Sequence, residues 1–273
     1  MENIIGHDYA KKKLIENLSI QTWLICGKRG IGKATFVRSF SDWLLVKRGN
    51  EVVMDLYFVD NGTIGIEKVR EIKNFLYLSS IQSKYKIVII DSLEAMTNNS
   101  QNAMLKILEE PPKNSKIFII SHEPYNIKST IKCRCFQLNL FPLGYVETRR
   151  VILSKYKFDD QVLSKIITVF PGRPGVIINI MNNNDVCEFF HTFPQNLNKP
   201  EIISRIISSE IELEFASRLI QLFILNKIKS EISSVEILLD KWKKIHELFI
   251  AAKQLDLDKK HILANAINII TSV

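Results

Sequence analysis

Cysteine and long apolar runs are scarce in this 273-residue sequence, and its first residues do not have the pattern of a targeting segment. The spacing of the four cysteines (Cys26, Cys133, Cys135 and Cys187) gives neither paired C-x-x-C zinc knuckles nor the disulfide framework of a small secreted domain, so we expect reduced thiols. No uncharged apolar run approaches the ~20 residues of a membrane span, and the first residues include acids instead of a basic n-region. We therefore expect a soluble, cytoplasmic protein with no membrane partner.

Acidic residues are also outnumbered, 29 against 37 lysines and arginines, which gives a net charge of +8. A basic surface attracts phosphates, so this balance would suit a nucleic-acid partner. Genome-wide nucleotide bias toward lysine codons is an alternative source of the charge. Because 46% of the residues are apolar, the chain can bury a substantial core, and its length suggests about two domains.

The first half of the chain alternates strand-like and helix-like segments, which predicts a parallel sheet wrapped by helices. Each expected strand is a short apolar run closed by polar or turn residues, as is typical of buried parallel strands. The expected strands are Thr22–Cys26, Leu56–Val59, Lys86–Asp91, Ile117–Ser121 and Phe136–Leu140. The expected helices between them are Gly32–Val46, Glu67–Leu78 and Asn98–Glu109, the last of which ends at Pro111-Pro112.

After Phe141-Pro142 the pattern becomes helical to the end of the chain. The expected helices are a segment from Tyr145, then Asp159–Val169, Pro174–Met181, Ile211–Leu225, Val235–Lys253 and Lys259–Ile270. The run N-N-N-D at residues 182–185 is the best candidate linker. We therefore predict three domains, an α/β nucleotide-fold core at residues 1–142, a small helical domain at 143–183 and an all-helical domain at 184–273.

The stretch C-G-K-R-G-I-G-K-A-T at residues 26–35 nearly matches the phosphate-loop pattern G-x-x-x-x-G-K-[ST]. It lies between a predicted strand and a predicted helix, where glycines let backbone N–H groups curl around a phosphate. The candidate nucleotide-binding residues of this stretch, which can be vestigial, are Gly27, Gly30, Gly32, Lys33, Ala34 and Thr35. Ala34 replaces the hydroxyl that would ligate Mg²⁺, and Thr35 points about 100° further round the helix.

A second nucleotide-site element is K-I-V-I-I-D at residues 86–91, an apolar strand that ends in Asp91. It has the form of a Walker B segment, in which the acid holds Mg²⁺. An active ATPase of this class usually has a glutamate next, whereas this chain has Ser92. Glu94 follows two positions later, where we expect a turn or helix start to direct it elsewhere, as a solvated first-turn acid.

Several segments together resemble a known family. I-I-G-H-D-Y-A, G-I-G-K-A-T, V-I-I-D-S-L-E-A-M, N-A-M-L-K-I-L-E-E-P-P and S-T-I-K-C-R-C are similar to the AAA+ clamp-loader subunits of bacterial DNA polymerase III, most of all those of the delta-prime type. The stretch from Trp242 resembles the collar helices of those subunits. The resemblance implies an AAA+ core with a five-stranded parallel sheet, a helical lid and a helical collar for oligomerisation.

In that family an S-R-C motif supplies an arginine finger, which reaches the γ-phosphate held by a neighbouring subunit. The motif here is Cys133-Arg134-Cys135, so the resemblance makes Arg134 the principal functional residue. A planar guanidinium suits this task better than a lysine. The alternative is that Arg134 pairs with a local acid.

Other residues take roles from the resemblance alone. Ser121 occupies the sensor-1 position, although a strand-end serine also serves as a cap. The family's sensor-2 arginine aligns with Gly175, and Arg173 lies two places early. His7 falls in the segment beside the adenine site, where a structural role is the alternative. Many relatives insert a four-cysteine zinc module between the two Walker segments, and this chain has no cysteine between Cys26 and Cys133, so we expect no zinc.

The resemblance implies a subunit that donates Arg134 in trans while a ring of five subunits loads the sliding clamp on primed DNA. Its partners would be the gamma or tau and delta subunits and, indirectly, the clamp and primer-template DNA. ATP is the implied nucleotide, but the loop can equally be retained as architecture, and Mg²⁺ binding is doubtful. Two alternatives remain, an ATP-hydrolysing motor of the gamma or replication-factor type that recruits Thr35 and Glu94, and an independent DNA-binding module.

Overall fold

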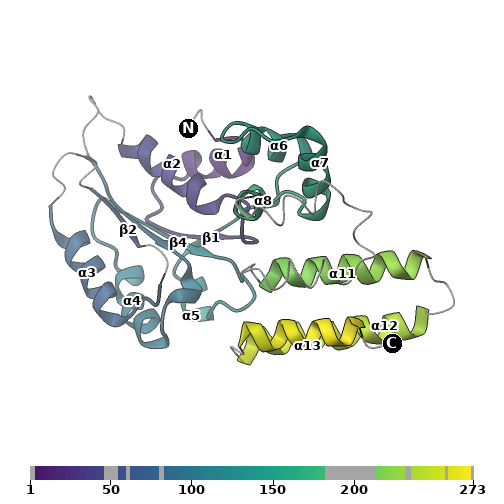
Figure 1. Cartoon of the computed structure of the whole chain (residues 1–273). Coiled ribbons are helices and arrows are strands. Elements are labelled where there is room, and N and C mark those ends of the chain that lie inside the picture. The colour runs from purple at the N-terminus through teal and green to yellow at the C-terminus, as the bar shows by residue number, and fades with distance from the viewer. Residues whose placement is uncertain are drawn as a thin grey trace. The chain divides into compact units, whose positions relative to one another are not determined.

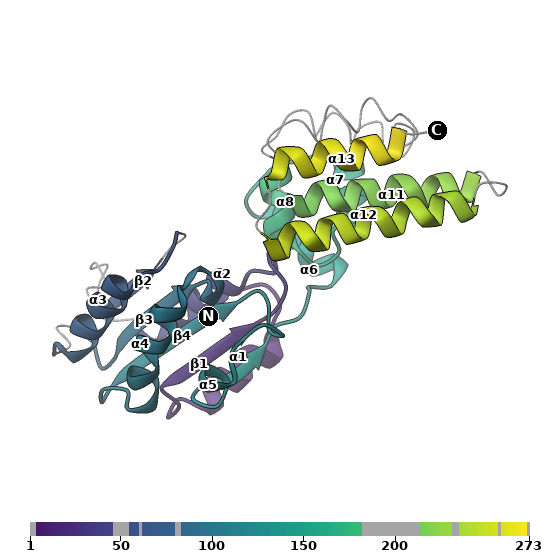
Figure 2. The same cartoon turned by 90° about the horizontal axis from the view of Figure 1, so that it is seen from below.

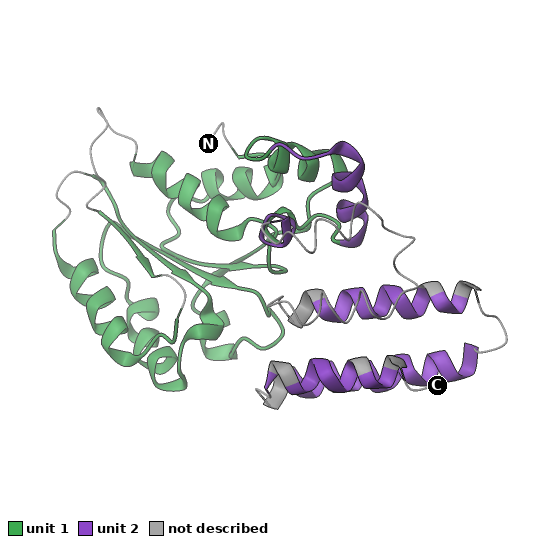
Figure 3. Cartoon of the chain, in the orientation of Figure 1, with its two compact units in different colours: residues 1–156, 170–176 green, residues 157–169, 177–273 purple. Residues whose placement is uncertain are grey.

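The computed structural model describes residues 4–45, 55–59, 62–79, 83–181, 213–230, 235–255 and 258–271. The chain divides into two compact units, residues 1–156 with 170–176, and residues 157–169 with 177–273 (Figure 3). The predicted three-domain division stays a prediction, because its second boundary and the linker at 182–185 lie outside the described residues. Cys187 lies outside them as well.

The first unit is built around a parallel sheet of five strands in the order β2-β3-β4-β1-β5. The strands are β1 (Thr22–Cys26), β2 (Leu56–Val59), β3 (Lys86–Asp91), β4 (Ser115–Ser121) and β5 (Phe136–Asn139). All five predicted strands are confirmed, although β4 starts earlier than expected and β5 ends before Leu140. Both neighbours of β1 are remote in sequence, since Leu24 lies opposite Ile119 of β4 and Gln137 of β5.

Helices cover both faces of this sheet (Figure 1). Successive side chains of a strand point to opposite faces, so each central strand contributes apolar side chains to a core on either face. On one face Leu24, Val88 and Ile119 pack in a core with α3 (Ile66–Tyr77), α4 (Asn98–Glu109) and α5 (Ser129–Lys132). On the other, Ile25, Ile89 and Phe118 pack with α1 (Asp8–Glu16) and α2 (Lys33–Leu45). Almost every one of these strand residues is fully buried, which explains why the strands are continuous apolar runs.

The bounds of α4 illustrate how local sequence sets a helix. The Thr97 hydroxyl accepts a hydrogen bond from the Ser100 backbone N–H at 3.2 Å and so caps the N-terminus. Pro111 and Pro112 follow its last residue, Glu109. Two further helical elements of this unit are the short η1 (Leu93–Ala95) and α6 (Tyr145–Leu153). The predicted helices were found, whereas α1, α5 and η1 were not predicted.

The second unit is helical in its described residues. It contains α7 (Asp160–Val169), α11 (Leu213–Ser230), α12 (Val235–Leu255) and α13 (Lys259–Thr271), while α8 (Pro174–Met181) begins in the first unit and continues in the second. Helices α11, α12 and α13 pack against one another, as Figure 2 shows. Their buried residues recur every three or four positions, as in Ala216, Ile220 and Phe223 of α11. Within the described residues, no helix combines the length and apolarity that a membrane span requires.

Candidate functional site

The predicted phosphate loop connects the end of β1 to the start of α2. Gly27, Gly30 and Gly32 all have positive φ angles, of 153°, 83° and 95°. A Cβ atom on Gly27 would lie 2.5 Å from the carbonyl oxygen of Leu140, so the following chain closes tightly over the loop. The backbone of this segment therefore requires glycine, as a phosphate loop does.

Lys33 is turned into this loop. Its Nζ atom donates hydrogen bonds to the carbonyl oxygens of Gly27 and Lys28, each at 2.7 Å, and the residue is 3% exposed. Burial lowers the pKa of the ammonium group to about 8, although the charges of Glu94 and Asp91 oppose this shift. The lysine therefore stabilises the loop itself in this structure.

The two residues after Lys33 face different surroundings. Ala34 packs against the apolar core on one face of the sheet, whereas Thr35 is exposed. The position that carries the magnesium-binding hydroxyl in the pattern is thus an apolar contact here. The chain offers Mg²⁺ no oxygen ligand at this position, so these residues do not fit a metal site.

The carboxyl ends of β3 and β4 bring a second group of predicted residues together. Asp91 ends β3, and Ser121 ends β4 and is fully buried. Glu94 is an exposed acid at the start of η1, as expected, and its carboxylate also reaches Ser121 at the end of β4. Its Oε1 accepts a hydrogen bond of 2.6 Å from the Ser121 hydroxyl, and its Oε2 accepts one of 2.9 Å from the Ser92 hydroxyl.

Backbone groups complete the surroundings of this carboxylate. Glu94 Oε1 also accepts hydrogen bonds from the N–H groups of His122 and Glu123, at 2.9 and 3.0 Å. Burial acts to raise the pKa of Glu94, but the hydrogen bonds from Ser121 and the other donors outweigh it and leave the pKa below its usual value. The Ser121 hydroxyl accepts a bond from the Glu123 N–H at 3.1 Å, so Ser121 also acts as the cap considered above.

His122 is a neighbouring residue that sequence reasoning missed. Its Nδ1 atom is buried and has no hydrogen-bond partner among the described residues. Burial and the nearby positive charges of Lys33 and Arg29 lower its pKa to about 4, so the ring is neutral at pH 7. Its position directly after a strand that ends at the carboxyl edge of the sheet was the only signal in the sequence.

His7 supports the loop from the other side. Its Nε2 atom lies 3.0 Å from the carbonyl oxygen of Ile31, and its ring meets that of Phe36 edge to face. Burial lowers the pKa of this histidine. These contacts agree with the structural alternative for His7.

The predicted sensor-2 segment lies directly on the phosphate loop. Arg173 Nε donates to the carbonyl oxygen of Arg29, and the N–H of Gly175 donates to that of Gly30, both at 2.8 Å. A Cβ atom on Gly30 would approach Val176 Cγ2 to 2.5 Å. The loop thus keeps the backbone of a phosphate site, but its lysine and the start of α8 are bound to the loop itself and fit an occupied site poorly.

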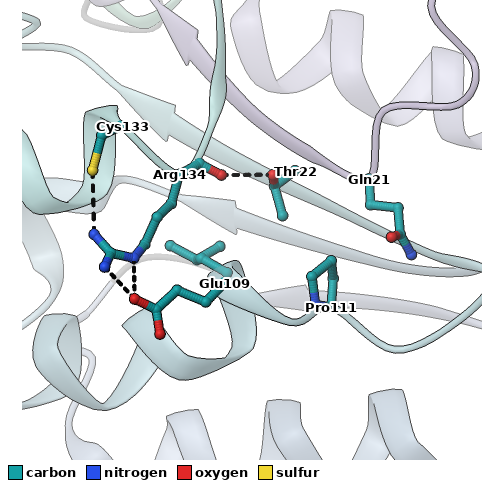
Figure 4. Close-up of a pocket in the computed structure, with 7 residues that line it drawn as sticks. Gln21, Thr22, Glu109, Pro111, Cys133 and Arg134 are labelled. Carbon is teal, nitrogen blue, oxygen red and sulfur yellow. Dashed lines mark hydrogen bonds and ion pairs between the residues drawn. The ribbon is translucent and has the colours of Figure 1, made fainter.

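Arg134 lies at the opposite end of the sheet, between α5 and β5. Its backbone carbonyl accepts a hydrogen bond of 2.8 Å from the hydroxyl of Thr22, the first residue of β1. Its guanidinium forms an ion pair with Glu109, the last residue of α4 (Figure 4). Nη1 also donates to the Thr130 carbonyl at 2.8 Å and contacts Cys133 Sγ at 3.2 Å. The predicted alternative, a local acid partner, is therefore present in this structure.

This pair lines an open depression of about 610 Å³. The lining residues are Gln21, Thr22, Leu108, Glu109, Pro111, Cys133 and Arg134. The Arg134 side chain is 28% exposed and that of Glu109 is 48% exposed. The guanidinium is thus neither buried in the fold nor fully free in solvent.

The described cysteines are all free thiols. Burial raises the pKa of Cys26 to about 11 and that of Cys135 to about 12, whereas Cys133 is exposed. Within the described ranges, no group of three or more His, Cys, Asp or Glu side chains is arranged to hold a metal ion. The absence of zinc stays a prediction.

Known proteins resemble this chain over both its sequence and its fold. A family model described as DNA polymerase III, delta subunit, matches residues 39–144. DNA polymerase III subunit gamma of Buchnera aphidicola subsp. Schizaphis graminum is 29% identical over 208 residues, which cover 67% of this chain and 57% of that protein. DNA polymerase III subunit delta' of Buchnera aphidicola subsp. Baizongia pistaciae is 38% identical over 79 residues, 29% of this chain and 24% of that protein.

A solved structure agrees with the fold. A DNA polymerase III gamma subunit-related protein of Thermotoga maritima aligns with a TM-score of 0.55 and 18% identity, over 96% of this chain and 97% of that one. The matched segments span between 24% and 57% of the two curated relatives. By its strand order, its motifs and these matches, the chain is similar to the AAA+ clamp-loader subunits of DNA polymerase III.

Proposed function

We propose that this chain is a delta-prime-type subunit of a DNA polymerase III clamp loader, which donates Arg134 in trans to a nucleotide held by a neighbouring subunit. The observation that carries the proposal is the separation of Arg134 from the chain's own phosphate loop. Arg134 is bonded to Thr22 at the start of β1, whereas the loop follows Cys26 at its end. The strand alone spans about 13 Å, which exceeds the reach of an arginine side chain.

The chemistry of the chain's own loop supports the same proposal. Ala34 and Ser92 replace two groups that an ATPase of this class uses, the magnesium-binding hydroxyl and the catalytic glutamate. Lys33 is bonded to loop carbonyls. We therefore propose that the loop serves as architecture or as a weak nucleotide site, with neither zinc nor tightly held Mg²⁺.

The proposed partners are the other clamp-loader subunits, gamma or tau and delta, in a five-membered ring that acts on the sliding clamp and primed DNA. Exposed apolar side chains on the C-terminal helices support an oligomerisation role. Leu225 of α11 and Ile237, Leu239 and Ile250 of α12 are each at least 44% exposed. Stable assemblies typically bury such side chains in interfaces of about 2,000 Å² or more.

The test is a reconstituted loader that carries Arg134→Ala. An arginine finger contributes about 10³ to 10⁵ in rate in related phosphoryl transfer, so we expect ATP hydrolysis and clamp loading to fall by at least about tenfold while assembly persists. Arg134→Lys should recover little activity, because a lysine lacks the planar fork. Lys132→Ala is the matched control, because it removes a cation only two residues before Arg134, at the end of α5. Unchanged hydrolysis in Arg134→Ala would remove the finger assignment.

One observation favours a second candidate, an ATP-hydrolysing motor. Glu94 lies at the same edge of the sheet as Asp91 and interacts electrostatically with Lys33. Against this, four donors already occupy its carboxylate oxygens. ATP turnover by the isolated chain that Lys33→Ala abolishes would favour the motor.

A further inference from the structure

The pair between Glu109 and Arg134 occupies most of the donors of the proposed finger. A guanidinium has five N–H donors. Nε and Nη2 both donate to Oε1 of Glu109, the first of them at 2.7 Å, and Nη1 donates to the Thr130 carbonyl and contacts Cys133 Sγ. These contacts with described residues account for four of the five, as the dashed lines of Figure 4 illustrate in part.

The backbones on either side of the pair are held in place. Arg134 is fixed by the hydrogen bond from Thr22 and by its own N–H, which donates to the Ile131 carbonyl at 3.1 Å. Glu109 is the last residue of α4, which the two prolines terminate. Only the two side chains are therefore free to rearrange.

The position of Glu109 is electrostatically unfavourable without a cation. The C-terminus of a helix carries a partial negative charge, so a carboxylate in the last turn is destabilised. Among the residues that line the depression, Arg134 is the only cation and Glu109 the only acid. Lys106 is the basic residue of the last turn of α4, and the Arg134 guanidinium adds a direct ion pair with the Glu109 carboxylate.

A phosphate and the Glu109 carboxylate would compete for the same N–H groups, because both are anions that bind a guanidinium fork. We propose that Glu109 is a positioning residue, which holds the Arg134 guanidinium in a retracted orientation until the phosphate of a neighbouring subunit displaces the carboxylate. This inference rests on the proposed function, because it assigns to Glu109 the control of the finger.

The decisive experiment compares Glu109→Gln with Glu110→Gln in the reconstituted loader. Glutamine keeps the size of the side chain but removes the charge that retains the guanidinium, and Glu110 is a matched control because it is the adjacent exposed acid. An exposed ion pair contributes modestly, so we expect Glu109→Gln to raise ATP hydrolysis by the neighbour about twofold to fivefold. Glu110→Gln should leave it unchanged.

A double-variant cycle shows whether Glu109 acts through Arg134. In the Arg134→Ala background, Glu109→Gln should have no further effect on hydrolysis. A decrease or no change in the single Glu109→Gln variant would overturn the proposal. An equal increase in Glu110→Gln, or an increase that persists without Arg134, would also overturn it.

The isolated chain provides a test that does not depend on partner subunits. In ¹⁵N NMR spectra, the Arg134 Nε–H signal, identified by its loss in Arg134→Lys, should exchange with water several times faster in Glu109→Gln than in the wild type. An unchanged exchange rate would overturn the proposal. If Arg134→Ala leaves the loader fully active, the finger assignment fails, and the NMR comparison still decides whether Glu109 retains the guanidinium.

Discussion

The contact between the start of α8 and the phosphate loop makes a quantitative prediction for Gly30→Ala. A Cβ atom on Gly30 would lie 2.5 Å from Val176 Cγ2 and 2.9 Å from the Val176 backbone nitrogen. Gly32 provides the matched control, because its φ is also positive, at 95°, but no atom lies within 4 Å of its would-be Cβ. The two substitutions share the backbone strain and differ in the steric clash.

The magnitudes follow from these two costs. Placing alanine at a left-handed φ costs about 1 to 2 kcal/mol, and forcing a methyl group into a packed site costs about 1 to 3 kcal/mol more. We therefore expect Gly32→Ala to lower the free energy of unfolding by about 1 to 2 kcal/mol and Gly30→Ala by about 2 to 5 kcal/mol. Adding Val176→Ala should recover only part of the difference, since the backbone nitrogen remains close.

The assay is urea unfolding followed by tryptophan fluorescence in a Trp242→Phe background. The remaining tryptophans, Trp23 and Trp43, both belong to the first unit, so the signal reports on the unit that contains the loop. Equal destabilisation by Gly30→Ala and Gly32→Ala would refute the reasoning, because the start of α8 would then not be seated on Gly30.

Two further predictions concern titrating groups. Relative to Lys33→Met, the free energy of unfolding of the wild type should rise between pH 8 and about 10.5. Lys33 loses its proton near pH 8 in the folded chain but near 10.5 in the unfolded chain, so the unfolded chain binds more protons in that interval. A constant difference between the two proteins in urea titrations across this range would contradict the prediction. In a brief iodoacetamide treatment at pH 8, peptide mapping should find Cys133 alkylated well before Cys26 and Cys135. Cys133 is exposed, whereas burial raises the pKa of Cys26 to about 11 and that of Cys135 to about 12. Equally fast alkylation of Cys26 would show that it is not buried.

The strands and long helices could be predicted because each carries its signal locally. Strand β3, for example, is an apolar run from Lys86 to Asp91 that is buried on both faces. Helix α1 was missed because lysines fill its centre and only Ala10 and Leu14 are buried, which leaves a weak helical pattern. Helix α5 was missed because four residues are too few to show a period.

The contacts of the site could be predicted only in part. The motifs identified Lys33, Asp91 and Arg134 singly, because each motif is a local pattern. The contact of Glu94 with Ser121 was missed, because the two residues are 27 positions apart and the turn of η1 that brings them together leaves no sequence pattern. The pair between Glu109 and Arg134 likewise unites two motifs through the fold alone.

Strand β1 has a mechanical consequence for any ring built from such folds. All five of its residues are buried, and it is hydrogen-bonded on both sides, to β4 and β5. One of its ends anchors Arg134 and the other carries the phosphate loop. In such a ring, the rigid strand β1 would set the distance between the phosphate loop and the arginine of each subunit. A subunit whose loop does not hydrolyse nucleotide would then still keep that distance for its neighbours.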